Sequence, residues 1–257
     1  MTTPRIFLPG GWTEGESIGL PKAESRHVQV LRLQPGDSVW LFNGEDGAEW
    51  PAEIVRIGRA EVEVRLGAAR PRPNRELPFA VTLAFGIPAN ERMDALVEKA
   101  TELGVAAIQP LICERSVLRL AGDRAEARQR HWGAVAASAS EQCGRVRVPF
   151  VAVPTKLAAW WRGLDAAGEV PSTTRWLLSL APTARPAAEL VGARADAGRP
   201  DVVVLSGPEG GLSPDEEAAA RGRGFVPVSL GPRTLRADTA PLALLACLAL
   251  AEAGRAA

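Results

Sequence analysis

From residue 1 to about residue 70, hydrophobic and polar residues alternate with a period of two in several short segments. Residues 52–57 and 60–66 alternate in this way, and the apolar runs 6–8 and 38–42 are equally short. Turns that contain glycine, asparagine and aspartate separate these segments, as they do in β-hairpins. Several short strands at this spacing predict a small β-barrel, with one helix expected over residues 22–31.

The pattern changes at residues 68–75, where arginine and proline break all periodicity and predict a linker. Beyond it, segments with the period of a strand alternate with segments with the period of a helix. Such alternation is typical of an α/β domain with a parallel sheet, so we predict a β-barrel domain over residues 1–72 and an α/β domain over 76–257. Strands are expected at 79–85, 105–113, 150–153, 176–180, 201–205 and 225–230, and helices from Asn90, over 124–142, around 157–161, from Pro214 and from Asp238 or Thr239.

Composition narrows the class of protein. The 257 residues carry 30 basic and 30 acidic side chains, so no overall field attracts a polyanionic partner. Three cysteines far apart in the sequence, with no CxxC, indicate a reducing compartment without disulfides or a zinc site. Two histidines make a histidine-based metal site or catalytic triad improbable, so we expect no metal. No signal peptide or membrane span is evident, so we expect a soluble cytoplasmic protein.

Two glycine-containing turns carry the most specific chemical signal. Residues 205–216 (LSGPEGGLSPDE) and 230–240 (LGPRTLRADTA) each follow a β-branched run and open a helix. Such turns can present backbone N–H and C=O groups to a polar small molecule. Neither has the glycine spacing of a dinucleotide fold or of a phosphate loop, so NAD and nucleoside triphosphates are disfavoured as ligands. Ser213 to Glu216 has the sequence of a capping box, with Pro214 at the first helical position.

These turns belong to a longer ordered series of segments. The others are 5–9 (RIFLP), 27–37 (HVQVLRLQPGD), 93–104 (MDALVEKATELG), 114–116 (ERS), and 141–142 with Arg145. With this series the chain resembles the ribosomal small-subunit methyltransferase E family of the SPOUT superfamily. The resemblance implies a PUA-like N-terminal barrel, an α/β domain with a deep trefoil knot, and a homodimer. It also implies S-adenosylmethionine as cofactor and methylation of a uridine N3 in 16S rRNA of the small ribosomal subunit, near the decoding centre.

The resemblance also implies a set of cofactor-binding residues in the two turns and before them. The glycines among them could instead serve only as turn residues ahead of a helix. The implied set is Leu178, Gly207, Gly210, Leu230, Gly231, Leu235 and Arg236.

Methyl transfer to uridine N3 requires that the N3 proton leave, or that a cation stabilise the negative charge developing on the ring oxygens. Arg236 and Arg233 are our candidates for the cation, and Glu209 is our candidate for the base. Each has a structural alternative. An arginine could pair with Glu209 or Asp238 to hold the loop, and Glu209 could cap a helix or hold an arginine.

Basic residues in two regions are candidates for contacts with RNA phosphates. In the barrel these are Arg5, His27 and Arg32, and in the middle of the chain Arg115 and Arg145. A solvated helix face is the simple alternative for the middle group. The apolar stretch around residues 242–248 is expected to be a buried helix. The resemblance implies that the dimer interface lies nearby.

Two other functions remain compatible with the sequence. One is a SPOUT methyltransferase that acts on another rRNA or tRNA position. The other is a non-catalytic RNA-binding or ribosome-assembly factor that uses the same fold as a scaffold.

Overall fold

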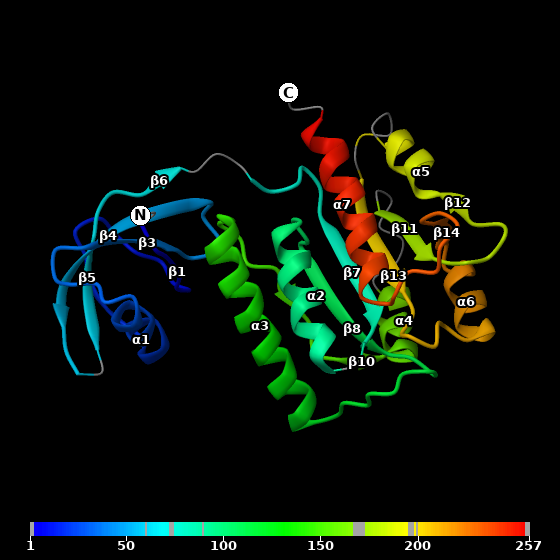
Figure 1. The fold of residues 1–257 in the computed structure, drawn as a ribbon, viewed down its shortest axis with the longest axis horizontal. Coiled ribbons are helices and arrows are strands. Elements are labelled where there is room, and N and C mark those ends of the chain that lie inside the picture. Colours follow the sequence, from blue (N-terminus) through cyan, green and yellow to red (C-terminus); the bar gives the residue numbers. More distant parts are fainter. Residues whose placement is uncertain are drawn as a thin grey trace. The chain divides into compact units, whose positions relative to one another are not determined.

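The computed structural model describes residues 3–59, 61–71, 75–88, 90–166, 173–194, 198 and 200–254 (Figure 1). Contacts divide the chain into two compact units. The first unit is Met1–Glu76 together with Ser140–Val148, and the second unit is Leu77–Ala139 together with Pro149–Ala257. Residue 60 and residues 72–74, which belong to a predicted strand and to the predicted linker, lie outside the described residues.

The first unit is built on a mixed β-sheet, the sheet predicted as a small barrel. Its described strands pair in the order β1-β3-β4-β5-β2, with β6 on β4; β1 runs parallel to β3 and the other pairs are antiparallel. The elements are β1 (Arg5–Phe7), β2 (Ser17–Leu20), α1 (Lys22–Val30), β3 (Ser38–Phe42), β4 (Ala48–Ile57), β5 (Val62–Leu66) and β6 (Arg70–Pro71).

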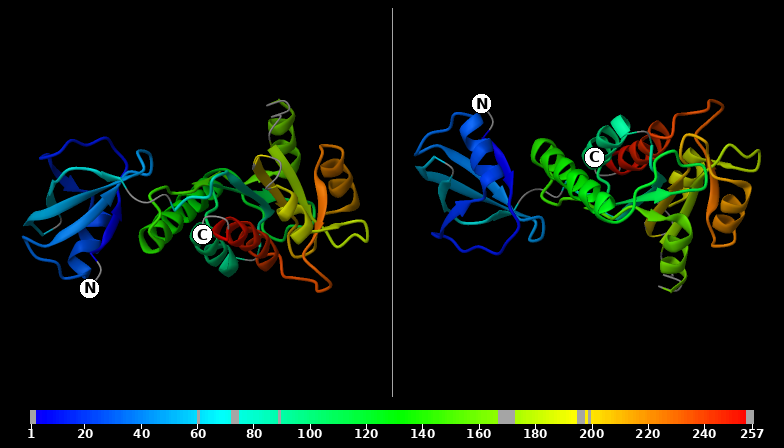
Figure 2. Two further views of the ribbon diagram at one scale, coloured as in Figure 1. Left: turned by 90° about the horizontal axis from the view of Figure 1, so that it is seen from above. Right: turned by 90° about the horizontal axis from the view of Figure 1, so that it is seen from below.

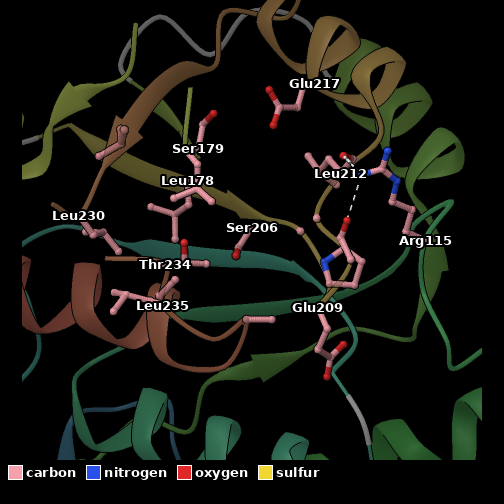
Figure 3. Close-up of a pocket in the computed structure, with 18 of the residues that line it drawn as sticks. Arg115, Leu178, Ser179, Ser206, Glu209, Leu212, Glu217, Leu230, Thr234 and Leu235 are labelled. Carbon is pink, nitrogen blue, oxygen red and sulfur yellow. Dashed lines mark hydrogen bonds between the residues drawn. The ribbon is translucent and has the colours of Figure 1, made fainter. Parts of the chain in front are cut away.

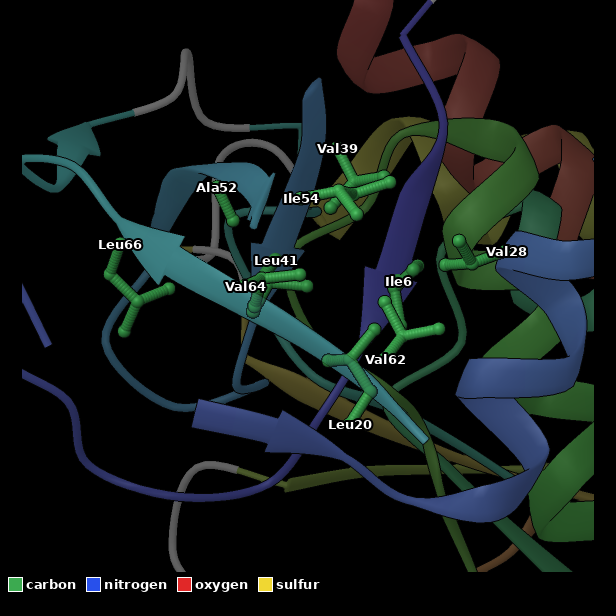
Figure 4. Packing of buried hydrophobic residues seen from close by; sticks show 10 residues of the cluster. All are labelled: Ile6, Leu20, Val28, Val39, Leu41, Ala52, Ile54, Val62, Val64 and Leu66. Carbon is green, nitrogen blue, oxygen red and sulfur yellow. The ribbon is translucent and has the colours of Figure 1, made fainter. Parts of the chain in front are cut away.

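Alternation along the strands produces the core of this unit. Ala52 and Ile54 of β4, and Val62, Val64 and Leu66 of β5, are all at most 2% exposed, while the residues between them face outward or are partly covered. Figure 4 shows these side chains gathered with others from β1, β2, β3 and α1. Burial of one such aliphatic side chain contributes roughly 1.5–3 kcal/mol.

Two strands of this unit, β2 and β6, differ from the prediction. Strand β2 was not predicted, because SIGL is too short to show a period. Strand β6 lies inside the predicted linker and pairs with β4, so this part of the linker belongs to the sheet.

Residues Ser140–Val148 join the first unit through two arginines. The Arg5 guanidinium forms an ion pair with Glu49 at 2.6 Å and donates hydrogen bonds to the carbonyls of Ser140, Glu141 and Arg145 at 2.7–2.8 Å. Arg145 pairs with Glu76 at 2.5 Å, and its side chain is 5% exposed. Carboxylates and carbonyls accept hydrogen bonds from both guanidinium groups. These interactions offset the free-energy cost of removing the two charges from water.

The second unit is an α/β domain, as predicted. All described strand pairs are parallel, in the order β10-β8-β7-β13-β11-β14-β12, with β9 on β8. The strands are β7 (Val81–Gly86), β8 (Ala107–Ile112), β9 (Phe150–Val151), β10 (Thr155–Lys156), β11 (Thr173–Leu178), β12 (Arg185–Pro186), β13 (Asp201–Ser206) and β14 (Val226–Ser229). The helices are α2 (Asn90–Glu102), α3 (Asp123–Cys143), α4 (Leu157–Ala166), α5 (Ala187–Arg194), α6 (Pro214–Arg221) and α7 (Thr239–Ala253). The last four residues of α3, 140–143, belong to the first unit.

Helices cover both faces of this sheet. Helix α7 contacts α2, α5, β7 and β13, and Figure 2 shows α2 and α7 on one side of the sheet and α4 on the other. On α7, Leu244, Leu245 and Leu248 are at most 1% exposed, so the predicted burial of this helix is confirmed for one face. The prediction is wrong for the face that carries Cys247 and Leu250, which are exposed. In the described part of the chain, no helix is both long and apolar enough to cross a membrane.

Helix α5 was not predicted. Its sequence, AAELVGAR, contains an internal glycine and spans only two turns, so its period is weak. It forms because Leu190 and Val191 are buried and because α5 packs against α7, a contact that is distant in sequence.

Candidate functional site

A pocket of about 390 Å³ lies where the carboxyl ends of β11, β13 and β14 meet (Figure 3). These strands are neighbours in the sheet and run parallel, so the loops that follow them leave the sheet at the same edge. The lining consists of Arg115, residues 178–180, 206–212, Glu217, Val228, Leu230, Gly231, residues 233–235, Ala237 and Ala240.

The turn after β13 requires glycine for steric reasons. A Cβ on Gly207 would lie 2.7 Å from the backbone nitrogen of Leu212, and Gly211 has a φ of +69°. The Gly211 N–H donates to the Pro208 carbonyl at 2.8 Å, which closes the turn. The backbone of this turn therefore lies directly against the pocket, without side chains between them.

The start of α6 holds the turn in place. Ser213 and Glu216 form the predicted capping box, with Pro214 in the first turn. The same Glu216 carboxylate also accepts a hydrogen bond from the Glu114 N–H at 2.8 Å. One side chain thus ties the helix start to the loop after β8.

Arg115 fixes the turn from the other direction. Its guanidinium donates to the carbonyls of Gly210 and Leu212 at 3.0 and 3.3 Å (Figure 3). Nearby, burial and the charge of Glu216 raise the pKa of the Cys113 thiol to about 12. Cys113 is therefore protonated at neutral pH and cannot act as a nucleophile beside the pocket.

The second glycine turn forms another wall. Gly231 has a φ of +103°, no atom lies within 4 Å of its Cβ position, and its N–H donates to the Ser229 hydroxyl at 3.3 Å. Leu178, Leu230 and Leu235 line the same part of the pocket (Figure 3). Backbone groups and apolar side chains together suit a ligand with a ring system and polar substituents.

The structure brings together most of the residues predicted from sequence. The pocket includes six of the seven residues expected to bind the cofactor, and also Arg233, Glu209 and Arg115. Arg236 does not line it. Its side chain is exposed, and its carbonyl accepts hydrogen bonds from the N–H groups of Thr239 and Ala240 at 3.0 Å, where α7 begins.

Four polar lining residues were missed by sequence reasoning: Ser179, Ser206, Thr234 and Glu217. Ser179 directly follows β11 and Ser206 ends β13. In the sequence, Ser179 stands one residue before the end of the predicted strand 176–180, and Ser206 follows the predicted strand 201–205. These positions were a usable signal, because strand ends in a parallel sheet meet at one edge. Glu217 carried no such signal. It follows the capping box and reads as an ordinary acidic residue in the first turn of a helix.

One of the five candidates for RNA contact, Arg115, binds the turn after β13, and the other four separate into two groups. The side chains of Arg5 and Arg145 are 10% and 5% exposed and are used within the first unit, so they do not form the open basic surface that was expected. A buried guanidinium whose N–H groups already bind a carboxylate has few donors left for a phosphate. His27 on α1 and Arg32 just after it are exposed.

Two protein families match this chain, one for each of its two units. An RNA methyltransferase domain family matches residues 75–249, and an RNA methyltransferase PUA domain family matches residues 20–67. The ribosomal RNA small subunit methyltransferase E of Synechocystis sp. is 33% identical over 90% of this chain and 72% of its own length. The chain belongs to the ribosomal RNA small subunit methyltransferase E family.

Solved structures agree with this family. Ribosomal RNA small subunit methyltransferase E from Neisseria gonorrhoeae, bound to S-adenosylmethionine, is 34% identical with a TM-score of 0.85, covering 96% of this chain and 97% of that one. A Legionella pneumophila protein in complex with the same cofactor is 35% identical with a TM-score of 0.86, covering 98% of each chain. The methyltransferase E family therefore accounts for both units, and the predicted combination of a PUA-like domain with an α/β methyltransferase domain is confirmed.

We predict that Gly86→Ala disturbs the turn after β13. Gly86 ends β7, and a Cβ there would overlap the backbone nitrogen of Pro208. Overpacking of this kind costs about 1–3 kcal/mol, so urea unfolding should show lower stability and amide exchange at 207–212 should accelerate. Gly163→Ala in α4, where nothing lies within 4 Å of the added Cβ, is the control. Equal behaviour of the two variants would contradict the predicted close approach.

Proposed function

We propose that the chain methylates N3 of a uridine in 16S rRNA, with S-adenosylmethionine as methyl donor. The observation that carries this proposal is the pocket at the ends of β11, β13 and β14, walled by two glycine turns. Family membership and two relatives solved with this cofactor support it. The relatives' names support small-subunit ribosomal RNA as the substrate, and the uridine N3 position rests on the resemblance of the sequence.

The residues of the pocket fit this cofactor. A volume of about 390 Å³ falls within the range of about 300–1,000 Å³ that is usual for small-molecule sites. Open Cβ positions at Gly211 and Gly231 leave the backbone accessible on both walls. Leu178, Leu230 and Leu235 provide apolar contact for the adenine ring, and peptide groups provide partners for its edge and for the amino acid part.

A bound S-adenosylmethionine supplies a methyl group already activated by the positive charge on sulfur. The chain must then hold the donor and the uridine in line. Arg233, at the pocket, and Arg236, where α7 begins, would stabilise the negative charge that develops on the uracil oxygens. Glu209, at the edge of the pocket, would accept the N3 proton.

Contacts with the rRNA would come from exposed basic side chains. In the first unit His27 and Arg32 are available on the surface, whereas Arg5 and Arg145 are not included because they are paired inside the unit. Since the total charge is zero, such contacts form a local patch. An rRNA substrate places this activity in the cytoplasm. The trefoil knot implied by the resemblance stays a prediction.

We also propose that the enzyme acts as a homodimer, through α7. The helix carries no charged residue from Thr239 to Ala251, yet Cys247 is exposed and Leu250 is 72% exposed. An uncharged exposed face beside a buried one is typical of a helix covered by a partner.

Two measurements test the proposed activity. Calorimetry should detect S-adenosylmethionine binding to the wild-type protein, and 16S rRNA from a deletion strain should lack one N3-methyluridine that the cloned gene restores. A methyl group missing at another rRNA or tRNA position instead would favour the related SPOUT activity. Absence of cofactor binding would favour the non-catalytic assembly factor.

We predict that Arg236→Ala abolishes methyl transfer while the protein stays folded. Removal of one charge-stabilising donor typically costs about 100- to 1,000-fold in rate, and the exposed Arg236 side chain contributes little to packing. A single-turnover assay measures the loss, with the exposed Arg162→Ala on α4 as the matched arginine control. A wild-type rate for Arg236→Ala would remove this residue from the mechanism.

We predict that Leu250→Glu converts the protein to a monomer, because a charge would be placed in the apolar contact. Val117→Glu, at a residue that is 88% exposed in the loop after β8, is the control and should leave the dimer intact. Sedimentation equilibrium distinguishes the two states. A dimeric Leu250→Glu variant would move the interface away from this end of α7.

A further inference from the structure

One carboxylate in the pocket has no role in the mechanism proposed above. Glu217 lies on α6 and lines the pocket (Figure 3). In that view Glu209 lies at the opposite side of the pocket from Glu217. A molecule that fills the pocket would therefore meet the two acidic residues at different points.

The backbone under Glu217 is rigidly positioned. Its N–H donates to the Ser213 carbonyl at 2.9 Å, directly behind the capping box of Ser213 and Glu216. Through Glu216 this helix start is also bonded to the loop after β8. A side chain on such a fixed turn can serve as a defined contact for a ligand.

The electrostatic surroundings favour hydrogen bonding over charge recognition. Glu217 forms an ion pair with Arg221 at 3.6 Å, one turn further along α6, and the two side chains are 33% and 40% exposed. Arg221 and solvent reduce the field that Glu217 exerts on a cation in the pocket. Its carboxylate oxygens still have several lone pairs available to accept hydrogen bonds from hydroxyl groups.

The other residues of the pocket indicate which hydroxyl groups of a ligand could donate to Glu217. Leu178, Leu230 and Leu235 suit a flat base, and the buried Ser179 also lines the pocket. A nucleoside places two neighbouring hydroxyls on the sugar beside its base. In dinucleotide-binding folds an acidic residue binds such a ribose hydroxyl, so the chemistry is established in general terms.

We propose that Glu217 accepts hydrogen bonds from the ribose hydroxyls of the cofactor and makes the pocket selective for ribonucleosides. This inference rests on the proposed use of S-adenosylmethionine. It assigns Glu217 to binding specificity and leaves the transfer of the methyl group to other residues.

Calorimetry with three ligands and three proteins tests the assignment. The ligands are S-adenosylmethionine, S-adenosylhomocysteine and 2′-deoxy-S-adenosylhomocysteine, and the proteins are wild type, Glu217→Ala and Asp215→Ala. Asp215 is an exposed acid in the same helical turn that does not line the pocket, so Asp215→Ala controls for loss of charge at the helix start. Thermal unfolding verifies that each variant is folded.

The wild type should bind S-adenosylhomocysteine about 10-fold more tightly than its 2′-deoxy analogue, as expected for a hydrogen bond to a charged group. Glu217→Ala should weaken both ribose ligands by about this factor and bind the deoxy analogue as the wild type does. Asp215→Ala should match the wild type throughout.

Other outcomes overturn the inference in distinguishable ways. If Glu217→Ala weakens S-adenosylmethionine alone, the residue recognises the positive charge on sulfur and not the ribose. If Glu217→Ala binds all three ligands with the affinities of the wild type, Glu217 has no part in ligand binding and only forms the ion pair with Arg221. If the wild type binds none of the ligands, the proposed function itself fails and this inference fails with it.

Discussion

The site depends on a steric constraint in the backbone between β13 and α6. The turn passes so close to β7 and to itself that no side chain fits at Gly86 or at Gly207. Glycine at these positions lets peptide groups take the place that side chains would otherwise occupy beside the pocket. Because peptide groups cannot change rotamer, the ligand meets a surface that is already in its binding geometry.

The turn is held by hydrogen bonds from the loop after β8 and from the start of α6. Arg115 binds the carbonyls of Gly210 and Leu212, and Glu216 bonds both to its own helix start and to the N–H of Glu114. The bonds of Arg115 and the bond between Glu114 and Glu216 join the loop after β8 to the turn after β13 and the start of α6, although β7 lies between the two strands in the sheet. A loop without this support would lose the conformation that binding requires.

Charged side chains also form part of the pocket lining. Glu209, Glu217 and Arg233 line the pocket along with its glycine turns. Under the proposed function this arrangement would separate two tasks, since the backbone would fit the shape of the ligand and the charged side chains would contact its polar groups. In the first unit, by contrast, Arg5 and Arg145 are paired with Glu49 and Glu76, and removing one partner of such a buried pair typically costs about 3–5 kcal/mol. Their role there is structural.

The sequence by itself determined the α/β domain, the helix start at Ser213 and the two glycine turns. These features are local, because period, capping residues and glycine positions depend on neighbours within a few residues. The two glycine turns contain most of the residues that line the pocket. Together with the resemblance carried by the ordered series of segments, they led to the prediction of nine of the twenty lining residues.

Only the tertiary structure decided which charged residues are available. Arg5 has the sequence context of an RNA contact, yet it is surrounded by the carbonyls of residues 140–145, which lie more than a hundred positions away in the chain. Glu217 has the sequence context of an ordinary helix-start acid, yet the sheet order brings β11, β13 and β14 together beside it. Short elements such as α5 also form through packing on distant segments, because eight residues carry too little periodicity of their own. Local patterns specify elements, but burial and pairing of a charge depend on contacts that no local pattern contains.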